Sequence, residues 1–151
     1  MYYNQEQLLL LKSIEGKLLT QVYYHFWVNK SKPDDVFSFV EYIELLMKDG
    51  STLVLQKAED NDMILPLAAI DIPTLNAQLM GDFNGQLQYQ SRNAGKTKAW
   101  EHLVNTIIDD VLVEEENGRF SAEIITIGNK NNQTIIRLEN DGLEAEEYII
   151  D

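Results

Sequence analysis

The chain has 151 residues, a hydrophobic fraction of 44% and no cysteine. These values are typical of a single globular domain spanning 1–151, and they exclude disulfides, thiolate metal sites and cysteine nucleophiles. The formal net charge is −13, and a field of this sign repels nucleic acid phosphates and anionic lipid. The start of the chain has neither a basic signal region nor an apolar stretch of membrane-spanning length. We therefore expect a cytoplasmic protein that binds neither nucleic acid nor a membrane.

The first predicted elements are a short helix and a long strand. Asn4 is a typical N-cap for a helix that continues to about Ile14, and Gly16 is a typical terminator after it. From 18 to 28, residue types that favour β-structure alternate along the chain, which predicts a strand.

A hairpin is predicted after this strand. Its first strand is expected over about 36–48, and its second over 52–57. The dipeptide Asp49–Gly50 between them is a strong signal for a tight hairpin turn. Residues 63–72 are apolar but contain Pro66, which favours an edge strand or irregular cover over a central strand.

The middle of the chain is predicted to contain a small hairpin and then the clearest helix. The hairpin would pair 77–80 with 86–90. The helix would begin near Thr97 and stop at Asn117–Gly118. Its apolar residues recur every three or four positions, the spacing of one helical face: Trp100, Leu103, Val104, Ile107, Ile108, Val111 and Leu112.

Two strands, 119–127 and 133–139, are expected after this helix, and 143–150 would form a terminal helix or strand. The predicted fold class is therefore α+β, with antiparallel sheet or sheets packed by about two helices. The expected order is α-β-β-β, an irregular or hairpin segment, then α-β-β and the terminal element.

The sequence contains no motif that identifies a catalytic or metal centre. Residues 90–97 end like a phosphate-binding loop, but that loop needs glycine where Gln90 stands. His25 and His102 are far apart and lack the spacing of metal ligands, and nothing pairs His25 with a particular serine. We therefore expect no metal ion and no cofactor.

Negative charge is concentrated in the last part of the chain. Residues 109–151 hold twelve acidic and three basic residues, a net of −9, whereas the first 108 residues have a net of −4. Such a field accelerates the encounter with a basic protein partner, although the same charge also serves solubility.

Two groups of residues are candidates for binding this partner. The first, on one face of the strand 18–28, has the aromatic types that dominate interface hot spots. The second is acidic and lies on and after the predicted helix. The candidates are Tyr23, His25 and Trp27 in the first group, and Asp109, Asp110, Glu114, Glu115 and Glu116 in the second.

These observations predict a non-catalytic acidic protein that captures a basic protein partner. The element order, small size and low pI look like those of acidic secretion chaperones of bacteria, and the acidic α+β immunity proteins that neutralise bacterial toxins are similar in the same sense. This resemblance implies a chaperone-like or immunity/antitoxin-like protein; it rests on architecture and assigns no role to a residue.

The alternative is a small hydrolase-type enzyme with a carboxylate-rich cleft, in which His102 and Asp109 could take part. The oligomeric state is open, and a homodimer through an edge strand is compatible with the sequence.

Overall fold

The computed structural model describes residues 1–29, 40–58, 62–139 and 142–148. These residues form two helices and two antiparallel sheets, which confirms the mixed α+β class. The helices are α1 (Gln5–Lys12) and α2 (Ile72–Asp82). The first sheet has the order β4-β3-β2-β1-β5, with β1 (Leu19–Asn29), β2 (Tyr42–Met47), β3 (Thr52–Lys57), β4 (Ile64–Leu67) and β5 (Leu87–Asn93). The second has the order β6-β7-β8-β9, with β6 (Asp110–Glu116), β7 (Arg119–Gly128), β8 (Gln133–Glu139) and β9 (Gly142–Tyr148).

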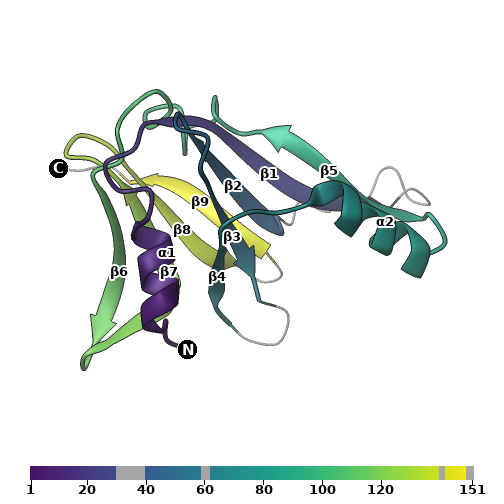
Figure 1. The fold of residues 1–151 in the computed structure, drawn as a ribbon, viewed down its shortest axis with the longest axis horizontal. Helices are drawn as coiled ribbons and strands as arrows, with labels where there is room; N and C mark the ends of the chain where they lie inside the picture. The colour runs from purple at the N-terminus through teal and green to yellow at the C-terminus, as the bar shows by residue number, and fades with distance from the viewer. Residues whose placement is uncertain (30–39, 59–61, 140–141, 149–151) are drawn as a thin grey trace.

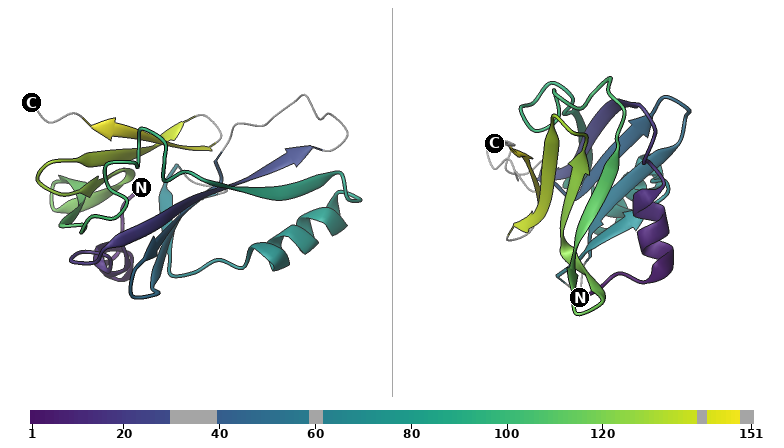
Figure 2. Two further views of the ribbon diagram at one scale, coloured as in Figure 1. Left: turned by 90° about the horizontal axis from the view of Figure 1, so that it is seen from above. Right: turned by 90° about the vertical axis from the view of Figure 1, so that its left-hand side faces the viewer.

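The two sheets pack face to face as two layers (Figures 1 and 2). Helix α1 contacts β4 and β6, so it covers the gap between one edge strand of each sheet. The strands β1 and β5 extend past the second sheet, and α2 packs against β5 on this extension (Figure 1).

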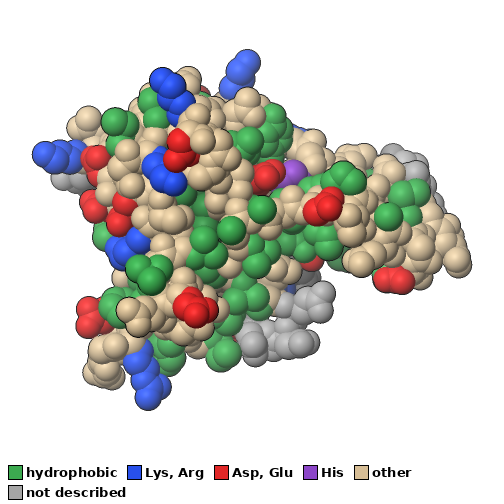
Figure 3. Space-filling model, in the orientation of Figure 1, with side chains coloured by type: hydrophobic (Ala, Val, Ile, Leu, Met, Phe, Trp, Pro, Cys, Tyr) green, Lys and Arg blue, Asp and Glu red, His purple; other side chains and the backbone are tan. Residues whose placement is uncertain are grey.

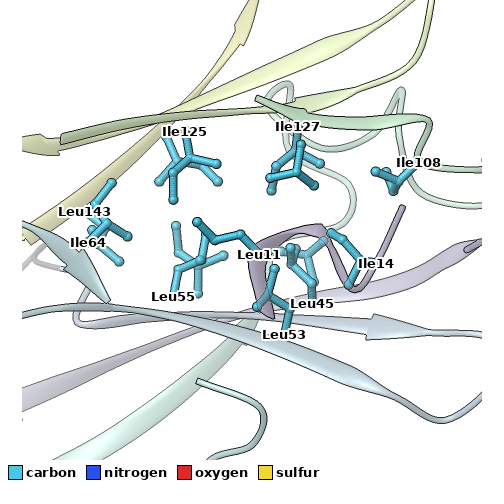
Figure 4. Close-up of a cluster of buried hydrophobic side chains, with 14 of the residues drawn as sticks. Leu11, Ile14, Leu45, Leu53, Leu55, Ile64, Ile108, Ile125, Ile127 and Leu143 are labelled. Carbon is cyan, nitrogen blue, oxygen red and sulfur yellow. The ribbon is translucent and has the colours of Figure 1, made fainter. Parts of the chain in front are cut away.

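The core lies between the two sheets. Ile125 and Ile127 of β7 oppose Leu45 and Leu55 of the first sheet, and Leu11 of α1 reaches in between them (Figure 4). All five side chains are at most 1% exposed. Burying side chains of this size contributes about 1.5–3 kcal/mol each, which makes this layer the main source of stability.

Several predicted elements are confirmed in place. The side chain of Asn4 accepts a hydrogen bond from the Gln7 N–H and caps α1, and the predicted long strand is β1. The turn at Asp49–Gly50 joins β2 to β3, and Gly50 has a φ of 89°. The edge strand with Pro66 is β4. The part of the second predicted strand that covers 36–39 lies outside the described residues.

The predicted helix over 97–116 is wrong. Residues 95–106 form turns and bends, Ile107 forms an isolated bridge with Leu18, and the chain then enters β6 at Asp110. Asn105 has a φ of 68°, which a helix does not allow, and its N–H donates to the carbonyl of Leu19, the first residue of β1. The apolar residues also fail to share one face, because Ile107 is 51% exposed and Leu112 is 46% exposed. The β-branched residues Val111 and Val113 instead fit the strand β6.

The dipeptide predicted to stop this helix forms a hairpin turn. Asn117 and Gly118 have φ values of 52° and 78°, the pair of positive angles that a two-residue turn between β6 and β7 requires.

The second helix of the structure is α2, which lies earlier in the chain than the predicted one. The element order on which the resemblance to secretion chaperones rests is therefore not the order of this structure.

The predicted hairpin of 77–80 with 86–90 is wrong in its first strand, which belongs to α2. Asp71 accepts a hydrogen bond from the Thr74 N–H as an N-cap, and Pro73 stands in the first turn, where its missing N–H has no cost. The terminal element is the strand β9, which pairs with β8, while 149–150 lie outside the described residues.

Candidate functional site

The aromatic candidates lie on the outer face of the five-stranded sheet. Along β1, Val22 and Tyr24 point into the core, so Tyr23, His25 and Trp27 point to the opposite face. Tyr23 and Trp27 are half-buried, whereas His25 is only 4% exposed. A docking partner on this face would therefore contact the neighbours of His25 more than His25 itself.

The polar groups of His25 and Trp27 have defined partners. The Nε2 atom of His25 is 2.9 Å from Oε1 of Glu44, and its Nδ1 atom is 2.6 Å from Oγ of Ser91. The indole N–H of Trp27 donates to Oε2 of Glu41 at 2.6 Å. The outer face of this sheet thus carries a hydrogen-bonded network that links β1, β2 and β5.

The acidic candidates lie on β6 and directly before it. Asp109, Asp110, Glu114, Glu115 and Glu116 are all exposed, and they belong to a strand or the residue before it rather than to a helix. Figure 3 shows the opposite side of the molecule, which carries α1 and α2, and there acidic and basic side chains are interspersed. The two predicted groups therefore belong to different sheets and do not form one site.

The outer face of the four-stranded sheet carries an apolar strip that sequence reasoning missed. Leu112, Ile124 and Ile135 lie on neighbouring strands and line an open hollow of about 400 Å³ together with Glu114 and Arg137. A second hollow, of about 330 Å³, shares Ile124 and Arg137. The signal was the run of isoleucines in 124–127, because a strand with one solvated face alternates apolar and polar residues.

Carboxylates surround this strip. Glu144 and Glu146 of β9 are the cross-strand partners of Arg137 and Ile135, and Glu139 follows on β8. A hydrogen bond shared with Glu146, then partial burial, then the charges of Glu139 and Glu146 raise the pKa of Glu144 above its usual value. Arg137 offers little compensation, because its Nη2 is 3.9 Å from Oε2 of Glu146. The carboxylates of this face therefore repel one another.

We refer to this surface as the acid-rimmed face. Its floor is Leu112, Ile124 and Ile135, and its rim is Asp110, Glu114, Glu139, Glu144 and Glu146. Only two of the five rim residues, Asp110 and Glu114, belong to the acidic group expected from the sequence. The other three come from β8, which pairs with β7, and from β9, which pairs with β8.

The raised pKa of Glu144 predicts how pH affects stability. A carboxyl group whose pKa is higher in the folded than in the unfolded state binds more protons when folded, so it favours folding as pH falls through the folded pKa. At neutral pH Glu144 is ionised and the repulsion is present. We expect Glu144→Gln to raise the urea midpoint at pH 7 and to lose this advantage at about pH 4. The matched control is Glu123→Gln on β7, and an equal shift for both variants at pH 7 would contradict the prediction.

The described residues contain neither a cluster of metal-ligand side chains nor a helix that could span a membrane. No group of three His, Asp or Glu side chains there converges closely enough to hold a metal ion. Neither α1 nor α2 is long and apolar enough to cross a bilayer. His102 and Asp109 are the residues named for the hydrolase alternative. His102 pairs with Glu147 at 3.0 Å and with Glu101 at 3.6 Å, and Asp109 is exposed just before β6.

Comparisons of the chain with models of protein families, with curated proteins and with solved structures find no match.

Proposed function

We propose that the protein is a protein-binding protein whose acid-rimmed face captures a basic partner. The observation that carries this proposal is an exposed apolar strip set among five carboxylates and a single arginine. Leu112, Ile124 and Ile135 offer area for an apolar anchor, while the rim attracts lysine and arginine. Binding of this kind makes and breaks no covalent bond.

The raised pKa of Glu144 supports a cationic occupant. Glu144, Glu146 and Glu139 destabilise one another in the free protein, and a lysine or arginine placed between them would remove that repulsion. The same charges repel phosphate groups, which favours a protein partner over nucleic acid. The proposed partner therefore presents a segment that carries both apolar and basic side chains.

The hollows on the molecule favour binding over the hydrolase alternative. A hydrolase of the expected kind needs a cleft that encloses carboxylates. The hollows at the acid-rimmed face are open to solvent, and so is a third of about 570 Å³ lined by Lys96, Glu101 and Asn105 among others. His102 lines none of these three.

Charge reversal on the rim tests the proposal. The immobilised full chain is used at low salt to capture its partner from a lysate of its own cells, and the affinity of the purified partner is then measured by calorimetry. We expect the double variant Glu114→Lys/Glu146→Lys to weaken binding by at least about tenfold and to flatten its dependence on salt. Leu112→Ala should also weaken binding without changing the unfolding midpoint, because Leu112 is 46% exposed.

The matched control is Glu6→Lys/Asp82→Lys. These exposed acids lie on α1 and α2, so the control changes the net charge by the same amount while leaving the acid-rimmed face intact. The proposal fails if the lysate yields no partner at low salt, or if both double variants weaken binding equally.

A further inference from the structure

A buried histidine connects a carboxylate and a hydroxyl across three strands of the five-stranded sheet. His25 on β1 is 4% exposed and lies between Glu44 of β2 and Ser91 of β5. Ser91 is directly opposite His25 in the β1–β5 register, and Glu44 is opposite the next outward-facing residue, Tyr23. The three groups therefore follow one another across the outer face of the sheet.

The partners of His25 determine the roles of its two ring nitrogens. An ionised carboxylate only accepts hydrogen bonds, so the contact of 2.9 Å with Glu44 requires the proton on Nε2. When the imidazole is neutral, Nδ1 then presents a lone pair, and the hydroxyl of Ser91 donates to it across 2.6 Å. A hydroxyl held in this way against a base that a carboxylate orients is the arrangement of an activated nucleophile.

The imidazole is also held in place. The ring of Tyr23 stacks beside that of His25, with centroids 6.4 Å apart and planes 16° apart. These contacts orient the ring before a proton is transferred, and burial limits the access of water to it.

Ser91 is accessible, although the histidine is not. It is an exposed residue on β5, an edge strand of its sheet. The N–H of Tyr89 points out from this edge and donates to Oδ1 of Asn76 at 2.7 Å. Because alternate residues of a strand direct their N–H groups to the same side, the N–H of Ser91 also points to the edge. It lies beside Oγ and could donate to an oxyanion formed there.

From this geometry we propose that Ser91 is a nucleophile that accepts an acyl group from an activated ester, with His25 as its general base and Glu44 as a positioning residue. Oγ of Ser91 forms a bond to the carbonyl carbon while its proton moves to Nδ1 of His25. The bond from that carbon to the leaving oxygen then breaks, and the proton passes from His25 to the leaving group. The products are acyl-Ser91 and an alcohol or phenol.

The surroundings of Ser91 define the class of ester. Ser91 is exposed on an edge strand and lines none of the three hollows described above. We therefore expect small, reactive esters to acylate Ser91. The site lies on the outer face opposite the acid-rimmed face, so this inference is independent of the proposed binding function.

Site-resolved acetylation tests the inference. The full chain is incubated with p-nitrophenyl acetate, and acetylation at each serine is followed by peptide mass spectrometry. Ser13 is the internal control, because it is exposed and its hydroxyl donates to the carbonyl of Leu10 rather than to a base. General base catalysis predicts acetylation of Ser91 on the order of 100-fold faster than that of Ser13.

Variants separate the relay from simple exposure. In Glu44→Gln, the side-chain amide can donate a hydrogen bond to Nε2, and the histidine proton then lies on Nδ1. Because a protonated Nδ1 does not accept the proton of Ser91, most of the rate advantage of Ser91 should be lost. Glu44→Asp, which retains a carboxylate, should restore part of it. Ser91→Ala is an exposed change that should leave the fold intact and abolish acetylation at that position. Equal rates at Ser91 and Ser13, or an undiminished rate at Ser91 in Glu44→Gln, would overturn the proposal.

Discussion

Replacement of Trp100 by alanine is expected to destabilise the folded protein by about 3–5 kcal/mol. The indole is fully buried among the turns that precede β6. Its N–H donates to the hydroxyl of Tyr24 at 2.7 Å, and burial raises the pKa of that hydroxyl. The variant would therefore leave a cavity and remove a partner from a hydroxyl that water reaches poorly.

Urea unfolding of Trp100→Ala beside Ile107→Ala measures this effect. Both residues belong to the stripe that the sequence placed on one helical face, yet Ile107 is 51% exposed. We expect Ile107→Ala to change the free energy of unfolding by about 0.5 kcal/mol or less. A comparable loss for both variants would support the helix that the sequence predicted and contradict the turns of this structure.

The second large effect is expected at Gly128, where β7 ends. A Cβ atom there would overlap the carbonyl oxygen of Asn132 and lie 2.8 Å from Cα of Gln133. Both obstacles are backbone of the connection to β8, so a flexible side chain cannot move away to relieve the clash. We expect Gly128→Ala to lower the free energy of unfolding by about 1–3 kcal/mol.

Gly81 provides the matched control. It lies within α2, and a Cβ added there meets no atom within 4 Å. Alanine is the better helix former, so Gly81→Ala should raise stability by about 0.5–1 kcal/mol. Opposite signs for the two substitutions in urea unfolding would agree with the structure, and a stabilising Gly128→Ala would contradict the close approach of the 128–133 backbone.

The two proposals concern separate surfaces and can fail separately. Charge reversal at Glu114 and Glu146 changes the rim on the four-stranded sheet, whereas Ser91 and Glu44 belong to the five-stranded sheet. Loss of partner binding in the first experiment therefore says nothing about acetylation of Ser91. If acylation of Ser91 leaves the affinity for the captured partner unchanged, the protein has two independent sites.

The errors of the sequence-based prediction have one physical origin. The apolar spacing from Trp100 to Leu112 fits a helix, but the dipeptide Asn117–Gly118 was interpreted as its stop although the same pair is also a strong hairpin signal. Residues 77–80 were likewise interpreted as a hairpin strand, whereas the cap Asp71 and Pro73 in the first turn begin the helix α2 that contains them. In each case two local interpretations were available, and the packing of neighbouring segments decided between them.

Neither candidate site could have been found by motif. Ser91 is 66 positions from His25, and no local spacing links them; the antiparallel register of β1 with β5 makes them neighbours. The acid-rimmed face depends in the same way on the pairing of β8 with β9.

By itself, the sequence determined the features that arise from contacts between near neighbours. These include the Asn4 cap, the Asp49–Gly50 turn, the alternating strand β1 and the excess of negative charge, because a cap or tight turn needs only a few adjacent residues. Only the tertiary structure decided which carboxylates surround an apolar strip and which serine faces the buried histidine. Those outcomes depend on strand order and register, since a shift of one residue would turn Ser91 to the other face of its sheet.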